Sequence, residues 1–142
     1  MGSSHTKYTD SEFNPYPDES EPIETRASAY TLDNYQEDAG ATAIYPGYGE
    51  GGLAQLNYVI LGLIGEAGEI ANKFKKVLRD DNAVVTNEAR DAILDEVGDV
   101  LWYCARIATE LSADLGDIAT DNLVKLADRK ARGVIKGSGN DR

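Results

Sequence analysis

Cysteine, histidine and basic residues are scarce in this chain of 142 residues. The single cysteine, Cys104, excludes an intramolecular disulfide framework and a metal site built from several cysteines. The single histidine, His5, disfavours histidine catalysis and histidine-rich metal sites. Lysine and arginine number 14 against 25 acidic residues, for a net charge of −11. We therefore expect no nucleic-acid polymer as a partner, because such a partner is bound by a basic face.

Long apolar runs are also missing. The longest, Tyr58–Ile64, is interrupted by Gly62 and is too short to cross a membrane. A signal peptide has a basic start followed by an apolar stretch, and we find no such pattern in this sequence. We therefore expect no membrane association and a location in a reducing cytoplasm. Apolar residues make up 42% of the chain and charged residues 27%, which is typical of a globular protein.

The composition divides the chain into three segments. Residues 1–27 contain three prolines, six acidic residues and few large aliphatic side chains, which is typical of a flexible arm. Residues 28–137 carry the apolar periodicity of one folded domain, and residues 138–142 form a polar tail. Within the chain, we expect residues 28–137 to supply the core.

Apolar residues recur every three or four positions in four stretches, which predicts amphipathic helices. The helices are expected from a cap at Ser28 or Thr31 to about residue 44, and over about residues 53–79, 87–112 and 117–132. Asn87 is the expected N-cap of the third helix. No stretch predicts a strand. The predicted fold is therefore all-α, a four-helix bundle.

Two of these helices look apolar over a wide arc, so we expect a second subunit to complete the bundle. In the fourth helix, Ile118, Leu123 and Leu126 are expected to face inward. The glycine-rich stretch Gly47–Gly52 is interpreted as a hinge or lid. Trp102 is expected in the core or at an interface.

Two pairs of carboxylates lie on the predicted helices. Glu66 and Glu69 are on the second helix, and Glu96 and Asp99 on the third. Residues three apart share a helix face. Glycine within a helix costs about 1 kcal/mol relative to alanine, so glycines beside acids indicate close backbone approach or room for a ligand. The glycines concerned are Gly65, Gly68 and Gly98.

Four acids between packed helices repel one another unless some are protonated or cations neutralise them. A set of oxygen ligands favours Mg²⁺ or Mn²⁺ and leaves positions for water and phosphate. Asn122, Lys125 and Arg129 follow one another at helical spacing and suit phosphate groups. Together these features indicate metal-assisted phosphoanhydride chemistry. The rival hypothesis is a non-catalytic helical interaction module whose acids face water.

The basic residues of the second helix have a simpler interpretation. Lys73, Lys75 and Lys76 lie towards its C-terminal end, where cations interact favourably with the helix dipole. We expect them to be solvent-exposed charges rather than phosphate ligands.

The segments Glu66–Glu69 and Asp95–Tyr103 resemble the ExxE…ExxD signature of the MazG-like all-α nucleoside triphosphate pyrophosphohydrolases. The stretch Asn122–Arg129 is similar to their C-terminal helix with the pattern Asn-xx-Lys-xxx-Arg. Tyr35-Gln36 and Thr42–Pro46 resemble the first helix of short, often phage-encoded members. The resemblance covers about residues 29–137 and departs from the short members in the acidic arm.

The resemblance implies hydrolysis of a nucleoside or deoxynucleoside triphosphate to the monophosphate and pyrophosphate, with Mg²⁺, or Mn²⁺ in its place. It implies control of the nucleotide pool and a homodimer or homotetramer. By position the metal ligands are Glu66, Glu69, Glu96 and Asp99, and either Glu66 or Glu69 activates water. The residues that match phosphate contacts or pocket walls are Tyr103, Asn122, Lys125 and Arg129, and Gln36 is a candidate for reading the base.

The resemblance to phage-type members favours a purine substrate, dGTP or GTP first, and the host cytoplasm as the location of a phage-encoded chain. The phosphoribosyl-ATP pyrophosphohydrolase of histidine biosynthesis shares the fold and the acids, and it is the alternative within the superfamily.

Overall fold

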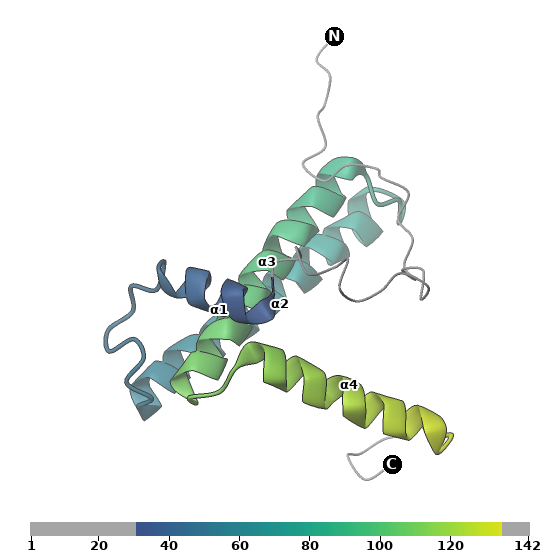
Figure 1. Ribbon diagram of the computed structural model, residues 1–142. Helices are drawn as coiled ribbons and strands as arrows, with labels where there is room; N and C mark the ends of the chain where they lie inside the picture. The colour runs from purple at the N-terminus through teal and green to yellow at the C-terminus, as the bar shows by residue number, and fades with distance from the viewer. Residues whose placement is uncertain (1–30, 135–142) are drawn as a thin grey trace.

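The computed structural model describes residues 31–134, which form four α-helices and no strand (Figure 1). The helices are α1 (Leu32–Gly40), α2 (Leu53–Asp80), α3 (Asn87–Glu110) and α4 (Leu115–Ala131). The all-α prediction is therefore confirmed for this part of the chain. The expected arm, the tail and the alternative cap at Ser28 lie outside the described residues.

Side-chain caps set the starts of α1 and α3. The Thr31 hydroxyl accepts the backbone N–H of Asn34 at 3.1 Å, and the Asn34 side chain accepts the Thr31 backbone N–H at 3.4 Å. At α3 the Thr86 hydroxyl accepts the backbone N–H of Ala89 at 3.1 Å. The prediction of Asn87 as the N-cap of α3 is therefore wrong by one residue. Thr86 has the extended backbone that an N-cap needs, whereas Asn87 is already helical.

Two other helix ends differ from the prediction because of hydrogen bonds outside the periodic pattern. α1 ends at Gly40 rather than near residue 44, since the backbone N–H groups of Thr42 and Ala43 bond three residues back in tight turns. α4 begins at Leu115 rather than near residue 117. Its first N–H groups are accepted by side chains of α1, which no local pattern reveals.

α2 and α3 lie side by side as a long helical hairpin, and α1 lies across α3 and the start of α4 (Figure 1). A small core forms where α1, α3 and α4 meet. Its buried members are Ala105, Ala108 and Leu115, with Leu32, Tyr35 and Cys104 packed against them. Within the described chain, α4 contacts α1 and α3 but not α2.

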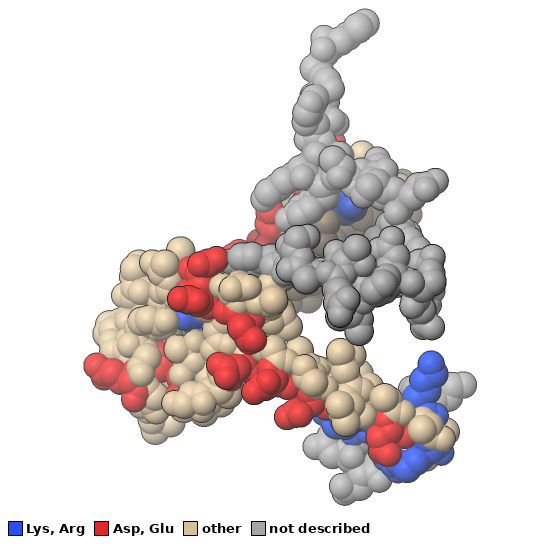
Figure 2. Space-filling view, viewed as in Figure 1, with Lys and Arg blue, Asp and Glu red and all other residues tan. Residues whose placement is uncertain are grey.

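The rest of α4 extends away from the hairpin. Figure 2 shows acidic side chains along α1 and the first half of α4, and basic side chains gathered at the far end of α4. Leu123 is 66% exposed, and Ile118 and Leu126 are exposed as well. The expectation that these three face inward is wrong for a single chain, because α4 has no helix beneath most of its length. No helix of the described part is long and apolar enough to cross a membrane.

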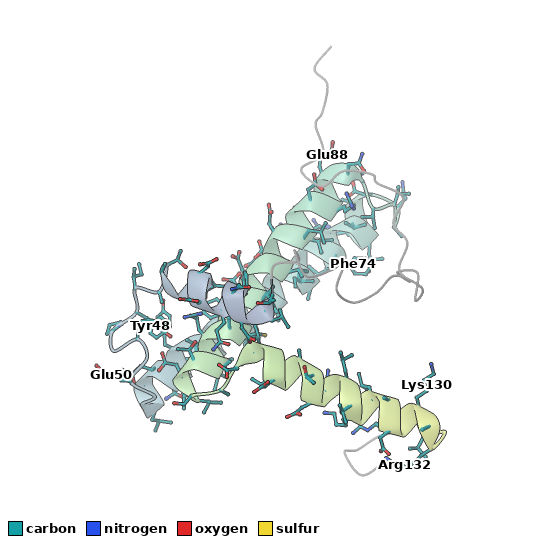
Figure 3. All side chains as sticks on the ribbon, in the orientation of Figure 1. Tyr48, Glu50, Phe74, Glu88, Lys130 and Arg132 are labelled. Carbon is teal, nitrogen blue, oxygen red and sulfur yellow. The ribbon has the colours of Figure 1, made fainter. Side chains whose placement is uncertain are left out.

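Glu110, at the end of α3, holds the loop between α1 and α2. Its side chain is buried and accepts the Tyr45 hydroxyl at 2.5 Å and the backbone N–H groups of Gly49 and Gly51 at 2.9 Å each. Both glycines have positive φ, which aims their N–H groups at the carboxylate. In Figure 3, Tyr48 and Glu50 mark this loop. The loop interpreted as a hinge or lid is thus anchored at its centre.

Burial alone would raise the pKa of Glu110, but the three hydrogen bonds and the charge of Arg106 outweigh burial and hold the pKa below its ordinary value of 4.5. The ionised carboxylate therefore contributes stability above the unfolded-state pKa. That contribution is lost as the pH falls through the lower, folded-state pKa.

We predict that Glu110→Gln lowers the free energy of unfolding by about 2 kcal/mol at neutral pH, because three donors lose a charged acceptor. The difference from the wild type should shrink as the pH falls below about 4.5. Urea unfolding from pH 3 to pH 7 measures this, with Glu50→Gln in the same loop as the control. A deficit that stays constant across the whole pH range would contradict the prediction.

Candidate metal and phosphate site

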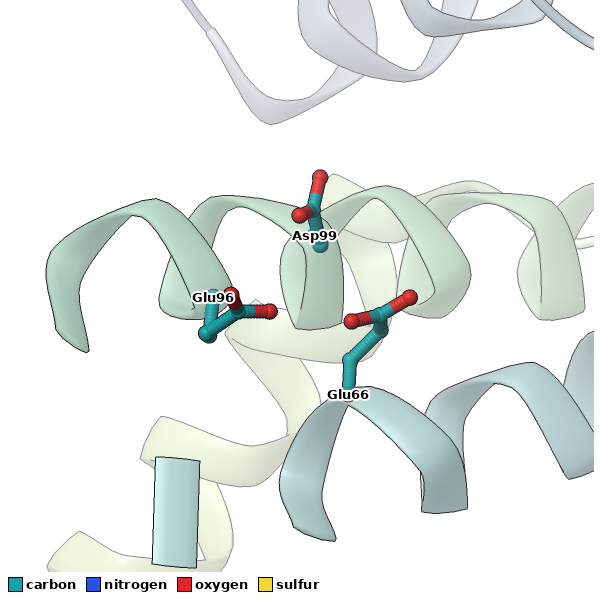
Figure 4. Close-up of side chains that lie close together, drawn as sticks. All are labelled: Glu66, Glu96 and Asp99. Carbon is teal, nitrogen blue, oxygen red and sulfur yellow. The ribbon is translucent and has the colours of Figure 1, made fainter. Parts of the chain in front are cut away.

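Three carboxylates converge between α2 and α3. Glu66 of α2 points towards Glu96 and Asp99 of α3 (Figure 4). One carboxylate oxygen from each of the three lies within 4.8 Å of the others. Glu66 and Glu96 are partly buried, and Asp99 is exposed. The pairing of α2 with α3 thus brings together acids that are about 30 residues apart in the sequence.

The acids relieve their mutual repulsion in two ways. Burial raises the pKa of Glu66, and the hydrogen bond with Glu96 and the charge of Asp99 raise it further. The hydrogen bond from Lys73 lowers the pKa of Glu96. The neighbouring acids thus disfavour the ionised form of Glu66, and the ammonium of Lys73 favours the ionised form of Glu96. Both effects reduce the repulsion among the acids.

Lys73 is the neighbouring cation. Its Nζ lies 2.6 Å from Oε1 of Glu96 and donates to the backbone carbonyl of Ala92 at 3.1 Å. The expectation that Lys73 is a solvent-exposed charge is therefore wrong, because the side chain bridges from α2 to α3. Lys75 and Lys76 are exposed, as expected.

Glu69 lies one turn along α2 from Glu66, and its side chain is exposed. It is outside the group of three converging oxygens, although its charge contributes to the raised pKa of Glu66. The described structure therefore brings together three of the four candidate acids and leaves the fourth beside them.

Tyr103 lies next to the acids. Burial raises the pKa of its phenol, and the charges of Glu66 and Asp99 contribute. Its ring meets Trp102 edge to face at a centroid distance of 4.9 Å. A Cβ on Gly62 would overlap the Tyr103 ring, so this glycine allows α2 to approach the tyrosine.

The glycines noted in the sequence have a different environment. A Cβ built on Gly65, Gly68 or Gly98 meets nothing within 4 Å in the described structure. We expected these glycines to allow either close backbone approach or room for a ligand. Within one chain, close backbone approach is wrong for all three, and the space beside the acids is open. No local pattern distinguishes Gly62 from these three glycines.

The polar ladder of α4, formed by Asn122, Lys125 and Arg129, does not lie beside the acids of α2. Asn122 and Lys125 line a cavity of about 620 Å³ with Leu101 and Cys104 of α3, and Arg129 is buried one turn further along. The apolar walls come from α1, α3 and the start of α4 rather than from α2. Within one chain, the structure does not bring these candidate phosphate ligands to the acids.

Gln36 has a structural role. Its side-chain amide nitrogen donates to the Thr109 hydroxyl at 3.1 Å and to the Ala113 carbonyl at 2.9 Å, and its side-chain oxygen accepts the Leu115 N–H at 2.6 Å. Both ends of the amide thus join α1 to the turn between α3 and α4. The hypothesis that Gln36 reads a base edge concerns this same amide, whose nitrogen and oxygen both have partners within the chain.

Trp102, expected in the core or at an interface, joins two helices of the same chain. Its indole N–H lies 2.8 Å from the Thr42 hydroxyl and 3.2 Å from the Ala39 carbonyl. These bonds tie α3 to the end of α1.

The sequence interpretation missed two buried charges on α3. Arg106 is fully buried and donates to the Tyr48 hydroxyl at 2.9 Å and to the Gln36 backbone carbonyl. Glu110 lies one turn further and holds the loop. The sequence does carry a signal for these buried charges. Arg106 and Glu110 are four residues apart, among small residues such as Ala105 and Ala108. Charged residues on an apolar helix face are seldom buried without partners, so this pattern indicates a buried polar contact.

The donor set fits a hard divalent cation. Mg²⁺ binds oxygen at 2.0–2.1 Å, so two ligands on opposite sides of the ion lie about 4.2 Å apart. Carboxylate oxygens within 4.8 Å of one another reach that separation by small side-chain movements. Cysteine and histidine, which would favour zinc, are not part of this cluster.

Comparison with known proteins supports the same interpretation. Residues 55–134 match the family model described as the MazG nucleotide pyrophosphohydrolase domain. The chain is also similar to the Gene 37 protein of Mycobacterium phage L5, with 53% identity over 112 residues, or 78% of this chain and 98% of that protein. No solved structure matches the chain. The family match includes the four acids and the polar ladder of α4.

Proposed function

The chain belongs to the MazG nucleotide pyrophosphohydrolase family, and on this premise we propose that it hydrolyses a nucleoside triphosphate between the α- and β-phosphates. Water adds to the α-phosphorus, the bond to the bridging oxygen breaks, and a nucleoside monophosphate and pyrophosphate leave. The observation that carries the proposal is the convergence of Glu66, Glu96 and Asp99, whose oxygens lie within 4.8 Å of one another.

These three acids would hold Mg²⁺, or Mn²⁺ in its place. When bound, such an ion neutralises phosphate charge and lowers the pKa of water. To hold the ion, Glu66 would have to be ionised, and Glu96 would have to leave its contact with Lys73 or share it. We assign Glu69 to orient the attacking water. A carboxylate outside the ligand group, one turn from Glu66, keeps its lone pairs for a hydrogen bond.

The cations for the phosphates are proposed to come from a neighbouring subunit. Lys125 and Asn122 lie on α4, which has no contact with the α2 of its own chain among the described residues. Large apolar side chains are exposed on both helices, which is typical of surfaces that pack in an oligomer. They include Leu61 and Ile64 of α2 and Leu123, Val124 and Leu126 of α4. A homodimer or homotetramer would cover these surfaces and bring an α4 to an acid site.

We propose a purine deoxynucleotide as the substrate, dGTP before GTP. The support is the resemblance of the first helix to those of phage-type members, together with the phage relative. Removal of such a nucleotide would adjust the nucleotide pool of a host cell.

Addition of millimolar Mg²⁺ is expected to raise the thermal unfolding midpoint of the wild-type chain, because an ion that binds only the folded state stabilises it. The Glu66→Gln/Glu96→Gln double variant should keep its fold and lose this response, whereas Glu88→Gln, on the exposed first turn of α3, should keep it. Scanning calorimetry with and without the ion measures both. A wild-type midpoint that does not respond to Mg²⁺ or Mn²⁺ would favour an interaction module.

A further inference from the structure

Lys73 makes a contact that the simple four-acid scheme does not include. Its ammonium lies 2.6 Å from Glu96 Oε1 and also donates to the Ala92 carbonyl at 3.1 Å. The side chain of Lys73 is 28% exposed and that of Glu96 is 15% exposed. The pair is therefore sheltered more than an ordinary surface ion pair, whose contribution is small.

The bonded carboxylate is also one of the three that converge. Glu96 accepts from Lys73, and one of its carboxylate oxygens also lies within 4.8 Å of oxygens of Glu66 and Asp99. A divalent cation among the three acids would compete with the ammonium for the negative charge of the Glu96 carboxylate. It would also be repelled by a positive charge at that distance.

We propose that Lys73 is the internal counter-cation of the acid site and competes with the divalent ion for Glu96. Without the ion, the ammonium neutralises Glu96 and keeps α2 and α3 together despite the clustered acids. With the ion, the ammonium moves off Glu96. Lys73 thereby sets the affinity of the site for divalent cations. This inference rests on the proposed function, because it takes the three acids to be metal ligands.

Two other possible roles of Lys73 predict different effects on metal affinity when the residue is replaced. If Lys73 only joins α2 to α3, its removal lowers the stability of the metal-free chain and leaves the metal affinity unchanged. If Lys73 holds Glu96 in position for the ion, its removal weakens metal binding. Competition alone predicts that removal strengthens metal binding.

The test is a titration of the full chain with Mn²⁺, followed by electron paramagnetic resonance of the free ion, without nucleotide. Lys73→Met is expected to lower the dissociation constant about fivefold or more, a size typical of coupling between two binding events. It should also lower the thermal midpoint of the metal-free chain. Lys76→Met, which removes a charge from the exposed part of the same helix, should change the constant less than about twofold.

Lys73→Arg provides a second variant that keeps the cation, and it should bind Mn²⁺ no more tightly than the wild type does. An unchanged or raised dissociation constant in a folded Lys73→Met chain would overturn the competition and leave the proposed function intact. If Lys73→Met does not fold, tighter binding by Lys73→Arg overturns the inference, and equal or weaker binding supports it. A wild-type chain that binds no Mn²⁺ at millimolar concentration would overturn the proposed metal site and this inference with it.

Discussion

Replacement of Glu96 with glutamine is expected to lower the rate of pyrophosphate release by about 100-fold or more, because a metal ligand and its charge are lost while the shape is kept. Glu66→Gln and Asp99→Asn should have effects of the same order. Glu69→Gln should be as slow, since the amide cannot take a proton from water. Steady-state assays at saturating Mg²⁺ and nucleotide measure these rates.

The stability of the same variants separates lost chemistry from lost fold. Glu66→Gln should leave the metal-free chain as stable as the wild type or more stable, because burial and the neighbouring acids raise the pKa of Glu66 and so disfavour its charged form. Glu96→Gln should be slightly less stable, because Lys73 loses its ion pair. Glu88→Gln, at the start of α3 (Figure 3), is the activity control. Near-normal turnover in any two of the four amide variants would contradict the four-acid scheme.

Replacement of Lys125 with alanine is expected to lower the maximal rate by about tenfold or more while the oligomer stays intact. A cation that faces the departing pyrophosphate stabilises charge that grows in the transition state, so turnover should suffer more than binding. Lys130→Ala at the far end of α4 (Figure 3) is the control. Size-exclusion chromatography confirms the assembly. An unchanged rate at every substrate concentration would mean that α4 takes no part in the reaction.

The position of α4 adds a sharper test of Lys125. Lys125→Ala and Glu96→Gln are each expected to be slow, but their co-expression should restore part of the activity if α4 serves a neighbouring acid site. In a randomly assembled two-fold dimer, half of the molecules are mixed, and each has one intact site, for about a quarter of the wild-type rate. Absence of any gain would mean that Lys125 does not act across subunits.

The sequence was sufficient for the number of helices and for the meeting of three of the four acids. A spacing of three residues places each pair on one face, and two long neighbouring helices have to pack as a hairpin. The start of α4 could not be predicted, because Gln36 and Asp33 of α1 accept its first N–H groups from about 80 residues away. Such tertiary caps leave no mark in the local pattern.

The interpretation of charged residues on α2 and α3 was also incomplete. Lys73 looked like a helix-end charge because its partner, Glu96, is on the other helix. Glu110 was passed over because its three donors come from a loop far away in the sequence. The direction of α4 depends on the turn at residues 111–114, which the apolar periodicity does not predict. Periodicity identifies the apolar face of a helix, but it does not show whether the same chain or another subunit packs against that face.

The most direct test of the central claim is to identify the products formed from each of the eight common nucleoside and deoxynucleoside triphosphates in Mg²⁺. Phosphorus NMR distinguishes pyrophosphate from orthophosphate in the reaction mixture. We expect a nucleoside monophosphate and pyrophosphate in equal amounts, most rapidly from dGTP, and no reaction without a divalent cation. A nucleoside diphosphate with orthophosphate, or no turnover of any of the eight with Mg²⁺ or Mn²⁺, would contradict this expectation.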